Sequence, residues 1–189
     1  MQKINRCKWA KNNRSLIKYH DEEWGIPVFN DQKIFEALSL EIFQAGLSWE
    51  IILNKRKEFR IAFDNFNYNL ISKYDESKLN SLYNNKKIIR NKLKIKSIRN
   101  NAISFIETRK AFGSFYKYIW SFTENQVIVN NYKNYKEIPV TSNLAIKISY
   151  DLKKRGFKFI GNIIVYSFIQ AIGIINDHTT DCFRYKDLS

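Results

Sequence analysis

Residues 82–92 have the sequence Leu-Tyr-Asn-Asn-Lys-Lys-Ile-Ile-Arg-Asn-Lys and separate two stretches in which apolar residues have helical spacing. The Asn-Asn-Lys-Lys centre is typical of a tight turn, so the segment predicts a helical hairpin. At the start of the second helix, backbone N–H groups without a helical partner can bind a phosphate. Lys87, Arg90 and Lys92 add positive charge around them, although a solvated helix end would have the same composition.

Helical periodicity continues on both sides of this hairpin. Asn30 or Asp31 is predicted to begin a helix that ends at Gly46, and Ser48 is predicted to begin the next one. Downstream, apolar stripes with helical spacing fall within residues 95–106, 115–122, 144–152 and 162–172, and Gly173 is predicted to end the last of these helices. Alternation of apolar and polar residues is not sustained anywhere, and residues 126–138 are interpreted as a loop. The predicted fold class is all-α.

The composition limits the class of protein. The chain has 189 residues, 44% of them hydrophobic and 15% aromatic, which suffices for a single packed domain. Two cysteines exclude a disulfide framework and a four-cysteine iron–sulfur cluster. The first residues lack the apolar region of a secretory signal, and the most apolar segment, 163–175, is too short to span a bilayer. We therefore expect a cytoplasmic monomer that does not bind membranes.

The charge of the chain favours a polyanionic partner. Thirty-two Lys and Arg residues against 18 Asp and Glu residues give a formal charge of +14, which nucleic acid would neutralise. A second basic stretch, residues 153–161, alternates aromatic and cationic side chains and offers Arg155 and Lys158 to a phosphate backbone. Because the chain is also rich in Asn and Ile, compositional drift explains the charge alone equally well.

All the histidines and cysteines of the chain are Cys7, His20, His178 and Cys182. Two thiolates and two imidazoles suit tetrahedral Zn²⁺. His178 and Cys182 have the spacing of one helical turn, and the segment between Cys7 and His20 is long enough to close around a metal. Four protein ligands leave no position for a reactive water, so such a zinc would be structural. The alternative is that the thiols are reduced core residues and the histidines have unrelated roles.

Glu41 is unusual because it lies on a largely apolar helix, close in sequence to Trp49. A carboxylate in such a place is solvated, paired or available to a ligand, because burial without a partner is costly. Tyr19, Trp24 and Trp49 offer flat faces for stacking and for cation–π contacts of about 0.5–2 kcal/mol each. This combination suits a flat, positively charged ligand. The alternative is that Glu41 pairs with a Lys or Arg and that the tryptophans belong to the core.

Four motifs follow one another along the chain: His-Asp-x-x-Trp-Gly at 20–25, Gln-Ala-Gly-Leu-Ser-Trp at 44–49, Arg-Gly-Phe-Lys-Phe-x-Gly at 155–161 and Asn-Asp-His at 176–178. In this order they resemble the DNA-3-methyladenine glycosylase I family, and the resemblance runs over nearly the whole chain. It implies a helix-hairpin-helix glycosylase fold within one domain, residues 1–189. Residues 1–26 and about 160–189 would form a zinc-binding lobe that joins the two termini, and residues from about 27 to about 159 a hairpin-containing lobe.

The same resemblance implies roles for individual residues. Glu41 would be the catalytic residue that binds the excised base, and the aromatic residues of the base pocket would be Tyr19, Trp24 and Trp49. The residues implied as ligands of one structural zinc ion are Cys7, His20, His178 and Cys182. Residues implied to contact DNA are Gln44, Gly46 and Leu47, which would fill the gap left in the duplex, and the basic residues Lys87, Arg90, Lys92, Arg155 and Lys158.

The activity implied by the resemblance is base-excision repair of double-stranded DNA that carries alkylated bases. The enzyme would hydrolyse the N-glycosidic bond of 3-methyladenine and release the free base. A methylated, cationic adenine is a good leaving group, so the protein must select and orient it more than force the chemistry. Neither a general base nor a lyase nucleophile is assigned, because the stretch after the hairpin offers Glu107 but no evident Asp. The alternative class is a zinc-containing DNA-binding protein without glycosylase activity.

The sequence departs from the pattern of the family in three places. Leu16 stands where the family often has a tyrosine, so we expect one wall of the base pocket to differ. Asn13-Arg14 replaces a common Asp-Pro. Lys87 stands where a glycine of the hairpin is frequent, so this turn is expected to form without a positive φ angle.

Overall fold

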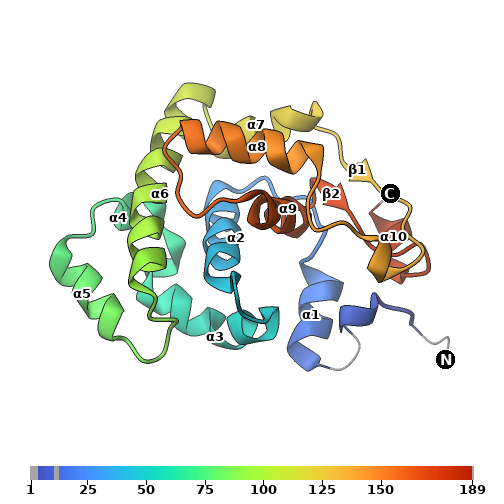
Figure 1. The fold of residues 1–189 in the computed structure, drawn as a ribbon, viewed down its shortest axis with the longest axis horizontal. Coiled ribbons are helices and arrows are strands. Elements are labelled where there is room, and N and C mark those ends of the chain that lie inside the picture. Colours follow the sequence, from blue (N-terminus) through green and yellow to red (C-terminus); the bar gives the residue numbers. More distant parts are fainter. Residues whose placement is uncertain (1–3, 11–12, 189) are drawn as a thin grey trace.

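The computed structural model describes residues 4–10 and 13–188, and its fold is all-α, as predicted (Figure 1). The α-helices of these residues are α1 (Arg14–Glu22), α2 (Asp31–Gln44), α3 (Trp49–Ala62), α4 (Tyr68–Ile71), α5 (Glu76–Asn84), α6 (Lys92–Phe112), α7 (Phe115–Trp120), α8 (Asn143–Lys154), α9 (Asn162–Ala171) and α10 (Phe183–Asp187). Two short strands, β1 (Ile128–Val129) and β2 (Ile175–Asn176), form a parallel pair. None of the described helices is long and apolar enough to cross a bilayer.

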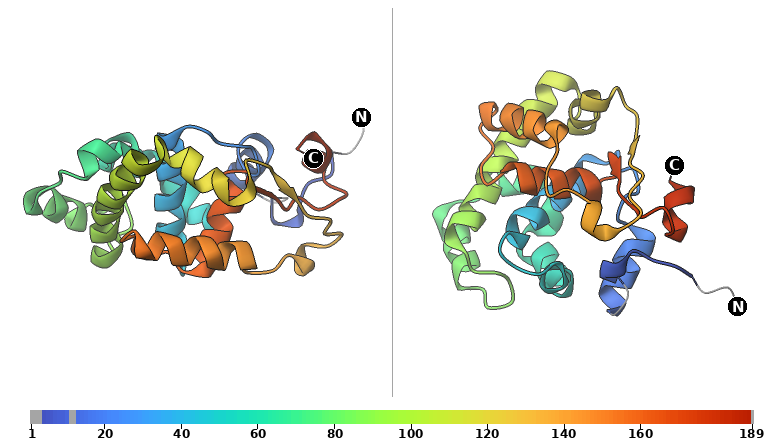
Figure 2. Two further views of the ribbon diagram at one scale, coloured as in Figure 1. Left: turned by 90° about the horizontal axis from the view of Figure 1, so that it is seen from above. Right: turned by 45° about the vertical axis from the view of Figure 1, so that its right-hand side comes forward.

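The helical hairpin and the two chain ends lie at opposite ends of the molecule. Figure 1 shows α2 and α9 in the middle, the α5–α6 hairpin on one side, and α1 with α10 on the other. The two further views in Figure 2 show the same separation. α2 packs against α3, α6, α7 and α9, and α8 covers α9. α2 therefore lies at the centre of the packing, in contact with α6 of the hairpin and with the central helix α9.

The buried apolar side chains form two clusters. The larger one joins the buried faces of α2, α6 and α9, and the smaller one contains Cys7, Tyr19, Trp24 and Cys182. α9 falls within the residues predicted to form a lobe with the termini, but its buried residues belong to the larger cluster. The division of the domain into two lobes stays a prediction.

The predicted helix ends agree with the structure. Asn30 is the N-cap of α2 and its side chain accepts a hydrogen bond of 3.0 Å from the backbone N–H of Lys33. Ser48 is the N-cap of α3, although its side chain makes no capping hydrogen bond. Gly173 follows α9 with a φ angle of 74°, and a Cβ atom there would lie 2.4 Å from the carbonyl carbon of Ile26. Only a glycine lets the end of α9 approach that segment so closely.

Several short elements were not predicted, among them α4, α10 and β2, and two further segments differ from the interpretation of the sequence. α1 was not predicted, because it is short and mostly polar, and only Tyr19 and His20 of this helix are buried. Asn13 caps this helix by accepting hydrogen bonds from the backbone N–H groups of its second and third residues. Residues 126–138 contain β1 and a 3-10 turn, Tyr135–Glu137. A strand of two residues is too short to show alternation in the sequence.

Candidate functional site

The four predicted metal ligands lie together in a buried cluster. One ligand atom from each of Cys7, His20, His178 and Cys182 lies within 4.8 Å of the others. The Sγ atom of Cys182 is 3.4 Å from Nε2 of His20 and 3.5 Å from Nδ1 of His178. With zinc–ligand bonds of about 2.0–2.3 Å, tetrahedral geometry separates neighbouring ligand atoms by about 3.3–3.8 Å. The cluster can therefore hold a metal ion, and its two thiols and two imidazoles fit Zn²⁺.

Neighbouring groups orient the two histidines of the cluster and change the pKa values of its two thiols. His20 places Nδ1 2.8 Å from Oδ1 of Asp21, and His178 places Nε2 3.2 Å from the carbonyl oxygen of Trp24. Each histidine thus has one nitrogen toward the cluster and one toward an acceptor, as metal-binding histidines commonly do. Hydrogen bonds from Cys7 and from both histidines lower the pKa of Cys182, whereas the hydrogen bond with Cys182 and burial raise the pKa of Cys7, so Cys182 is the sulfur that more readily becomes a thiolate.

His178 and Cys182 converge through a turn, so the interpretation of their spacing as one helical turn was wrong. β2 leads into His178, and the N–H of Cys182 donates to the carbonyl of Thr179 at 2.8 Å. Cys182 is the N-cap of α10. Gly25, with a φ angle of 80°, lies against this site, since a Cβ atom there would be 3.0 Å from Nε2 of His178. There is little room for a side chain at position 25, which explains the glycine after Trp24 in the first motif.

A cavity of about 570 Å³, here called the front cavity, brings the predicted base-binding residues together. Its lining includes Leu16, Tyr19, Trp24, Glu41, Gln44 and Trp49. Three different helices supply the central residues: Tyr19 comes from α1, Glu41 from α2 and Trp49 from the first position of α3. The ring centroids of Tyr19 and Trp49 are 5.3 Å apart, with an angle of 52° between the planes. Leu16 also lines this cavity, and its effect on the base pocket stays a prediction.

Glu41 is the buried carboxyl group of the front cavity. Its exposed fraction is 5%, and no residue that the structure describes forms a hydrogen bond or an ion pair with its side chain. Burial raises the pKa of Glu41 to about 8. The described residues therefore do not provide the Lys or Arg partner that the sequence left open. The group can accept hydrogen bonds from a ligand, and a positive ligand would favour its ionised form.

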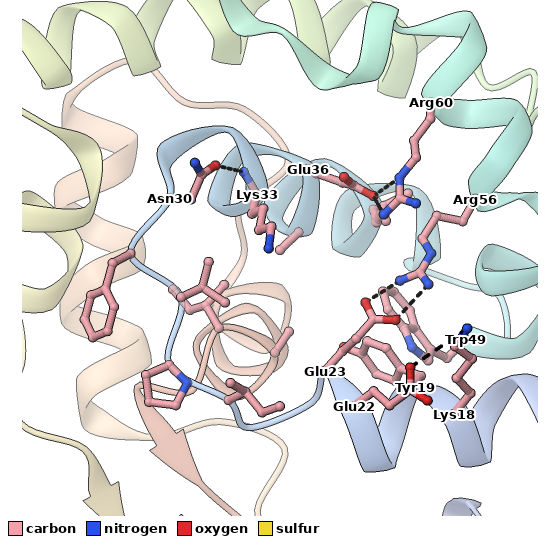
Figure 3. Close-up of a pocket in the computed structure, with 18 residues that line it drawn as sticks. Lys18, Tyr19, Glu22, Glu23, Asn30, Lys33, Glu36, Trp49, Arg56 and Arg60 are labelled. Carbon is pink, nitrogen blue, oxygen red and sulfur yellow. Dashed lines mark hydrogen bonds and ion pairs between the residues drawn. The ribbon is translucent and has the colours of Figure 1, made fainter.

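A second cavity of about 580 Å³, here called the rear cavity, shares Tyr19 and Trp49 with the front cavity (Figure 3). Its carboxylates are paired. Glu23 accepts two hydrogen bonds from Arg56, at 2.5 and 2.8 Å, and Glu36 accepts one from Arg60 at 2.8 Å. Tyr19 and Trp49 thus line two cavities of similar volume. The carboxylates of the rear cavity are paired with basic residues, whereas Glu41 in the front cavity has no described partner.

The loop between α2 and α3 carries the residues predicted to enter the duplex. Gln44 lines the front cavity, and its Nε2 donates to the carbonyl of Leu47 at 2.8 Å. Gly46 has a φ angle of 85°, and Leu47 is 36% exposed. The loop therefore presents an exposed apolar side chain beside the front cavity.

The hairpin between α5 and α6 has the predicted basic surface. Lys87, Arg90 and Lys92 are all exposed. No residue from 85 to 91 has a positive φ angle, so the turn forms with a lysine at position 87, as expected. Asn91 caps α6 by accepting a hydrogen bond of 3.1 Å from the N–H of Lys94.

Arg155 and Lys158 lie in the connection between α8 and α9, which packs against α6. Nε of Arg155 donates to Asp151 at 2.7 Å, and its guanidinium lies 4.8 Å from the ring centroid of Phe112. Lys158 is exposed, and its backbone N–H donates to Oδ1 of Asn101 at 2.7 Å. Arg155 therefore has partners within the protein, and DNA contacts by either residue stay predictions.

Sequence reasoning missed one wall of the front cavity. Residues 135, 136 and 138–140, of which those up to 138 are interpreted as a loop, line it together with residues of α9. Asp177 holds this wall: it accepts hydrogen bonds of 2.6 Å from the Tyr166 hydroxyl, 2.6 Å from Gln170 and 2.7 Å from Asn130. Two features of the sequence could have indicated this wall. They are the Pro139-Val140 pair after a polar stretch and the Asp of the Asn-Asp-His motif.

Comparisons with known proteins agree with this geometry. The chain matches the methyladenine glycosylase family over residues 9–185. It is 38% identical over 177 residues to a DNA-3-methyladenine glycosylase of Haemophilus influenzae, covering 94% of this chain and 96% of that protein. A crystal structure of 3-methyladenine DNA glycosylase I has a TM-score of 0.92 at 39% identity, covering 95% of this chain and 98% of the other. A Staphylococcus aureus structure that describes 3-methyladenine recognition has a TM-score of 0.91 at 30% identity, covering 95% and 96% of the two chains. The chain belongs to the methyladenine glycosylase family.

Proposed function

We propose that the chain repairs alkylated DNA by hydrolysing the N-glycosidic bond of 3-methyladenine, with the front cavity as its base pocket. Membership of the family and the 3-methyladenine recognition described for the Staphylococcus aureus structure support this activity. The observation that carries the assignment of the pocket is the position of Glu41. It is a buried carboxyl group without a partner among the described residues, in a cavity also lined by Tyr19 and Trp49.

The proposed recognition depends on the positive charge of the methylated base. The target nucleotide leaves the duplex at a cost of a few kcal/mol, less for a damaged base. Its base then stacks on Tyr19 and Trp49, and Glu41 accepts hydrogen bonds from its edge. A cationic base favours the ionised form of Glu41, whose pKa burial has raised to about 8. Neutral adenine lacks this attraction, so the pocket selects against it.

The reaction itself is a hydrolysis. The bond between C1′ and N9 breaks, and its electron pair goes to the purine, which thereby loses its positive charge. Water supplies a hydroxyl group to C1′, and the remaining proton goes to solvent. We assign no general base, and the reaction needs no lyase step.

DNA binding is proposed to involve two surfaces. Gln44, Gly46 and Leu47 would occupy the gap left by the extruded nucleotide. Lys87, Arg90 and Lys92, all exposed at the hairpin, would contact phosphates of the duplex. The formal charge of +14 supports such an interaction.

We infer that Cys7, His20, His178 and Cys182 hold one structural Zn²⁺. The ion would join the segment before α1 to the segment before α10, and through His20 it would fix the helix that carries Tyr19. Metal analysis of the purified protein is expected to find about one zinc per chain. Chelation is expected to lower the melting temperature, and an intact, metal-free protein of equal stability would refute the zinc assignment. A cytoplasmic location and a monomeric state stay predictions.

The activity is tested by incubating the protein with methylated duplex DNA and separating the released bases by chromatography. We expect release of 3-methyladenine and little release of 7-methylguanine. Binding of the duplex without release of any base would contradict the proposal and support the alternative, a DNA-binding protein without glycosylase activity.

A further inference from the structure

Lys94, in the first turn of α6, is a buried lysine that the proposed mechanism does not use. Its exposed fraction is 7%. Its Nζ donates hydrogen bonds to the carbonyl oxygens of Phe43, at 3.1 Å, and Ala45, at 2.6 Å. These carbonyls lie at the C-terminal end of α2, where the helix provides no N–H partner and where a cation is favoured by the helix dipole. Lys94 therefore caps α2 from a neighbouring helix.

The capped end of α2 is the part of the helix that carries functional residues. Glu41 lies one turn before Ala45, and the N–H of Ala45 donates to the carbonyl of Glu41 at 3.3 Å. Gln44 precedes the capped residue directly, and Gly46 and Leu47 follow it. A change in the position of these carbonyls would move both the base-binding carboxyl group and the loop proposed to enter the duplex.

The other end of the connection is the hairpin. The backbone N–H of Lys94 donates to Oδ1 of Asn91, which closes the hairpin loop. The hairpin also has a tie to α3, since Nζ of Lys55 donates to the carbonyl of Lys87 at 2.9 Å. The backbone of Lys94 is thus bonded to the end of the hairpin loop, and its side chain is bonded to the C-terminal end of α2.

Lys94 also differs from the lysines assigned to phosphate binding. Lys87 and Lys92 are exposed, whereas the ammonium group of Lys94 is directed into the protein and bonded to two carbonyls. Its charge is therefore used within the fold and is not presented to the DNA surface.

We propose that Lys94 is a positioning residue that couples DNA binding at the hairpin to the placement of Glu41 and of the loop at residues 44–48. This inference rests on the proposed glycosylase function. Phosphate contacts at the start of α6 fix the first turn of that helix, and the Lys94 side chain transmits its position to the end of α2. Loss of this connection leaves the DNA-binding surface intact and misplaces the groups that act on the extruded nucleotide.

The test compares Lys94→Met with Lys110→Met in the full-length protein. Methionine keeps the length of the side chain and removes its charge. Lys110 is a matched control because it lies on the same helix, is exposed, and pairs only with nearby Glu107 among the described residues. Both variants are assayed for 3-methyladenine release under multiple turnover. A duplex with 2-aminopurine beside a tetrahydrofuran abasic analogue reports, by its fluorescence, how far the bound protein opens the stack.

Lys94→Met is expected to lower kcat by about 10–100-fold, because displacement of a catalytic group by about 1 Å has this effect. KM should change little, and the 2-aminopurine signal at saturating protein should fall. Lys110→Met should retain the parental kcat and signal. Lys94→Arg, which keeps a cation with several donors, should recover most of the lost kcat. Thermal unfolding is measured for each variant, and Lys94→Gln replaces Lys94→Met if the latter is unfolded at the assay temperature.

Two results would overturn the inference while leaving the glycosylase function intact. A rise in KM with unchanged kcat would show that Lys94 contributes only charge to DNA binding. Equal behaviour of Lys94→Met and Lys110→Met would show that the contacts with Phe43 and Ala45 do not position the site. Failure of the parental protein to release 3-methyladenine would instead contradict the proposed function.

Discussion

The front and rear cavities have similar volumes, about 570 and 580 Å³, and share Tyr19 and Trp49, but their charges are arranged differently. In the rear cavity, Glu23 and Glu36 are each bonded to an arginine (Figure 3). In the front cavity, no described residue pairs with the more deeply buried Glu41. Paired carboxylates contribute to the fold, whereas an unpaired buried one opposes folding unless a ligand completes it. The two cavities share an aromatic wall, but only the front cavity has a buried carboxyl group without a described partner. The front cavity is therefore the better candidate for the reaction.

The largest expected effect is that of removing this carboxyl group. Glu41→Ala should lower the rate of 3-methyladenine release by about 100-fold or more, because the cationic base loses its anionic partner. Binding to undamaged duplex should change little, since Glu41 is buried away from the DNA surface. Single-turnover kinetics measure the first quantity and a gel-shift titration the second. Glu36→Ala, on the rear cavity, is the matched control, and release by Glu41→Ala at the parental rate would break the comparison.

Removal of the common wall should have the next largest effect. Trp49→Ala removes a stacking face, which is worth about 1–3 kcal/mol per base, or about 5- to 150-fold in affinity. Isothermal titration with free 3-methyladenine measures this loss. Phe29→Ala, which changes only the lining of the rear cavity, should bind the base as the parental protein does. Equal losses in both variants would mean that the base occupies the rear cavity.

The pKa of Glu41 predicts a pH dependence of binding. We expect the affinity for 3,9-dimethyladeninium, whose charge does not titrate, to rise about tenfold per pH unit up to pH about 8 and then to level off. The sign follows because the cation binds the ionised carboxylate, and below its pKa this form is the minor one. Glu41→Gln should abolish the slope. A slope that persists in Glu41→Gln would assign the titration to another group.

The same pKa has the opposite effect on stability. A carboxyl group with a raised pKa in the folded state binds a proton that the unfolded chain releases above pH about 4.5. The unliganded protein should therefore lose stability from this group as the pH rises from about 4.5 to about 8. Comparison of the melting temperatures of the parental protein and Glu41→Gln across this range isolates the contribution, which must vanish in the variant.

The smallest effect is expected from the ion pair of the rear cavity. Arg56→Met breaks a partly exposed pair and should cost about 1 kcal/mol of unfolding free energy, as urea denaturation would show. Base release should stay within about threefold of the parental rate, because Glu23 and Arg56 do not line the front cavity. A loss as large as that of Trp49→Ala would show that this pair orients the shared aromatic wall.

The sequence was most informative where a feature is local. The helix starts at Asn30 and Ser48 and the end at Gly173 follow from short-range backbone chemistry, and all three were predicted. The set of candidate metal ligands was also predictable, because the chain has only two histidines and two cysteines, and the structure brings them together.

Features that depend on distant contacts could not be predicted in the same way. α1 is stabilised by the cluster around Tyr19 and His20, which includes residues from the other end of the chain. Residues 135, 136 and 138–140 line the front cavity, and the segment before them is bonded to distant residues, since β1 pairs with β2 and Asn130 donates to Asp177. The position of Lys94 against α2 has no sequence signal, since its charge resembles that of every other lysine in a basic chain.

The consecutive placement of Tyr19 and His20 on α1 has a consequence for the order in which the protein is built. His20 meets its partners His178 and Cys182 only when that late part of the chain has been synthesised, long after the helical hairpin is complete. A nascent chain can therefore present its basic hairpin before the aromatic wall beside His20 is held in place. In the order of synthesis, the hairpin proposed to contact DNA therefore precedes the segment that completes the surroundings of the proposed base pocket.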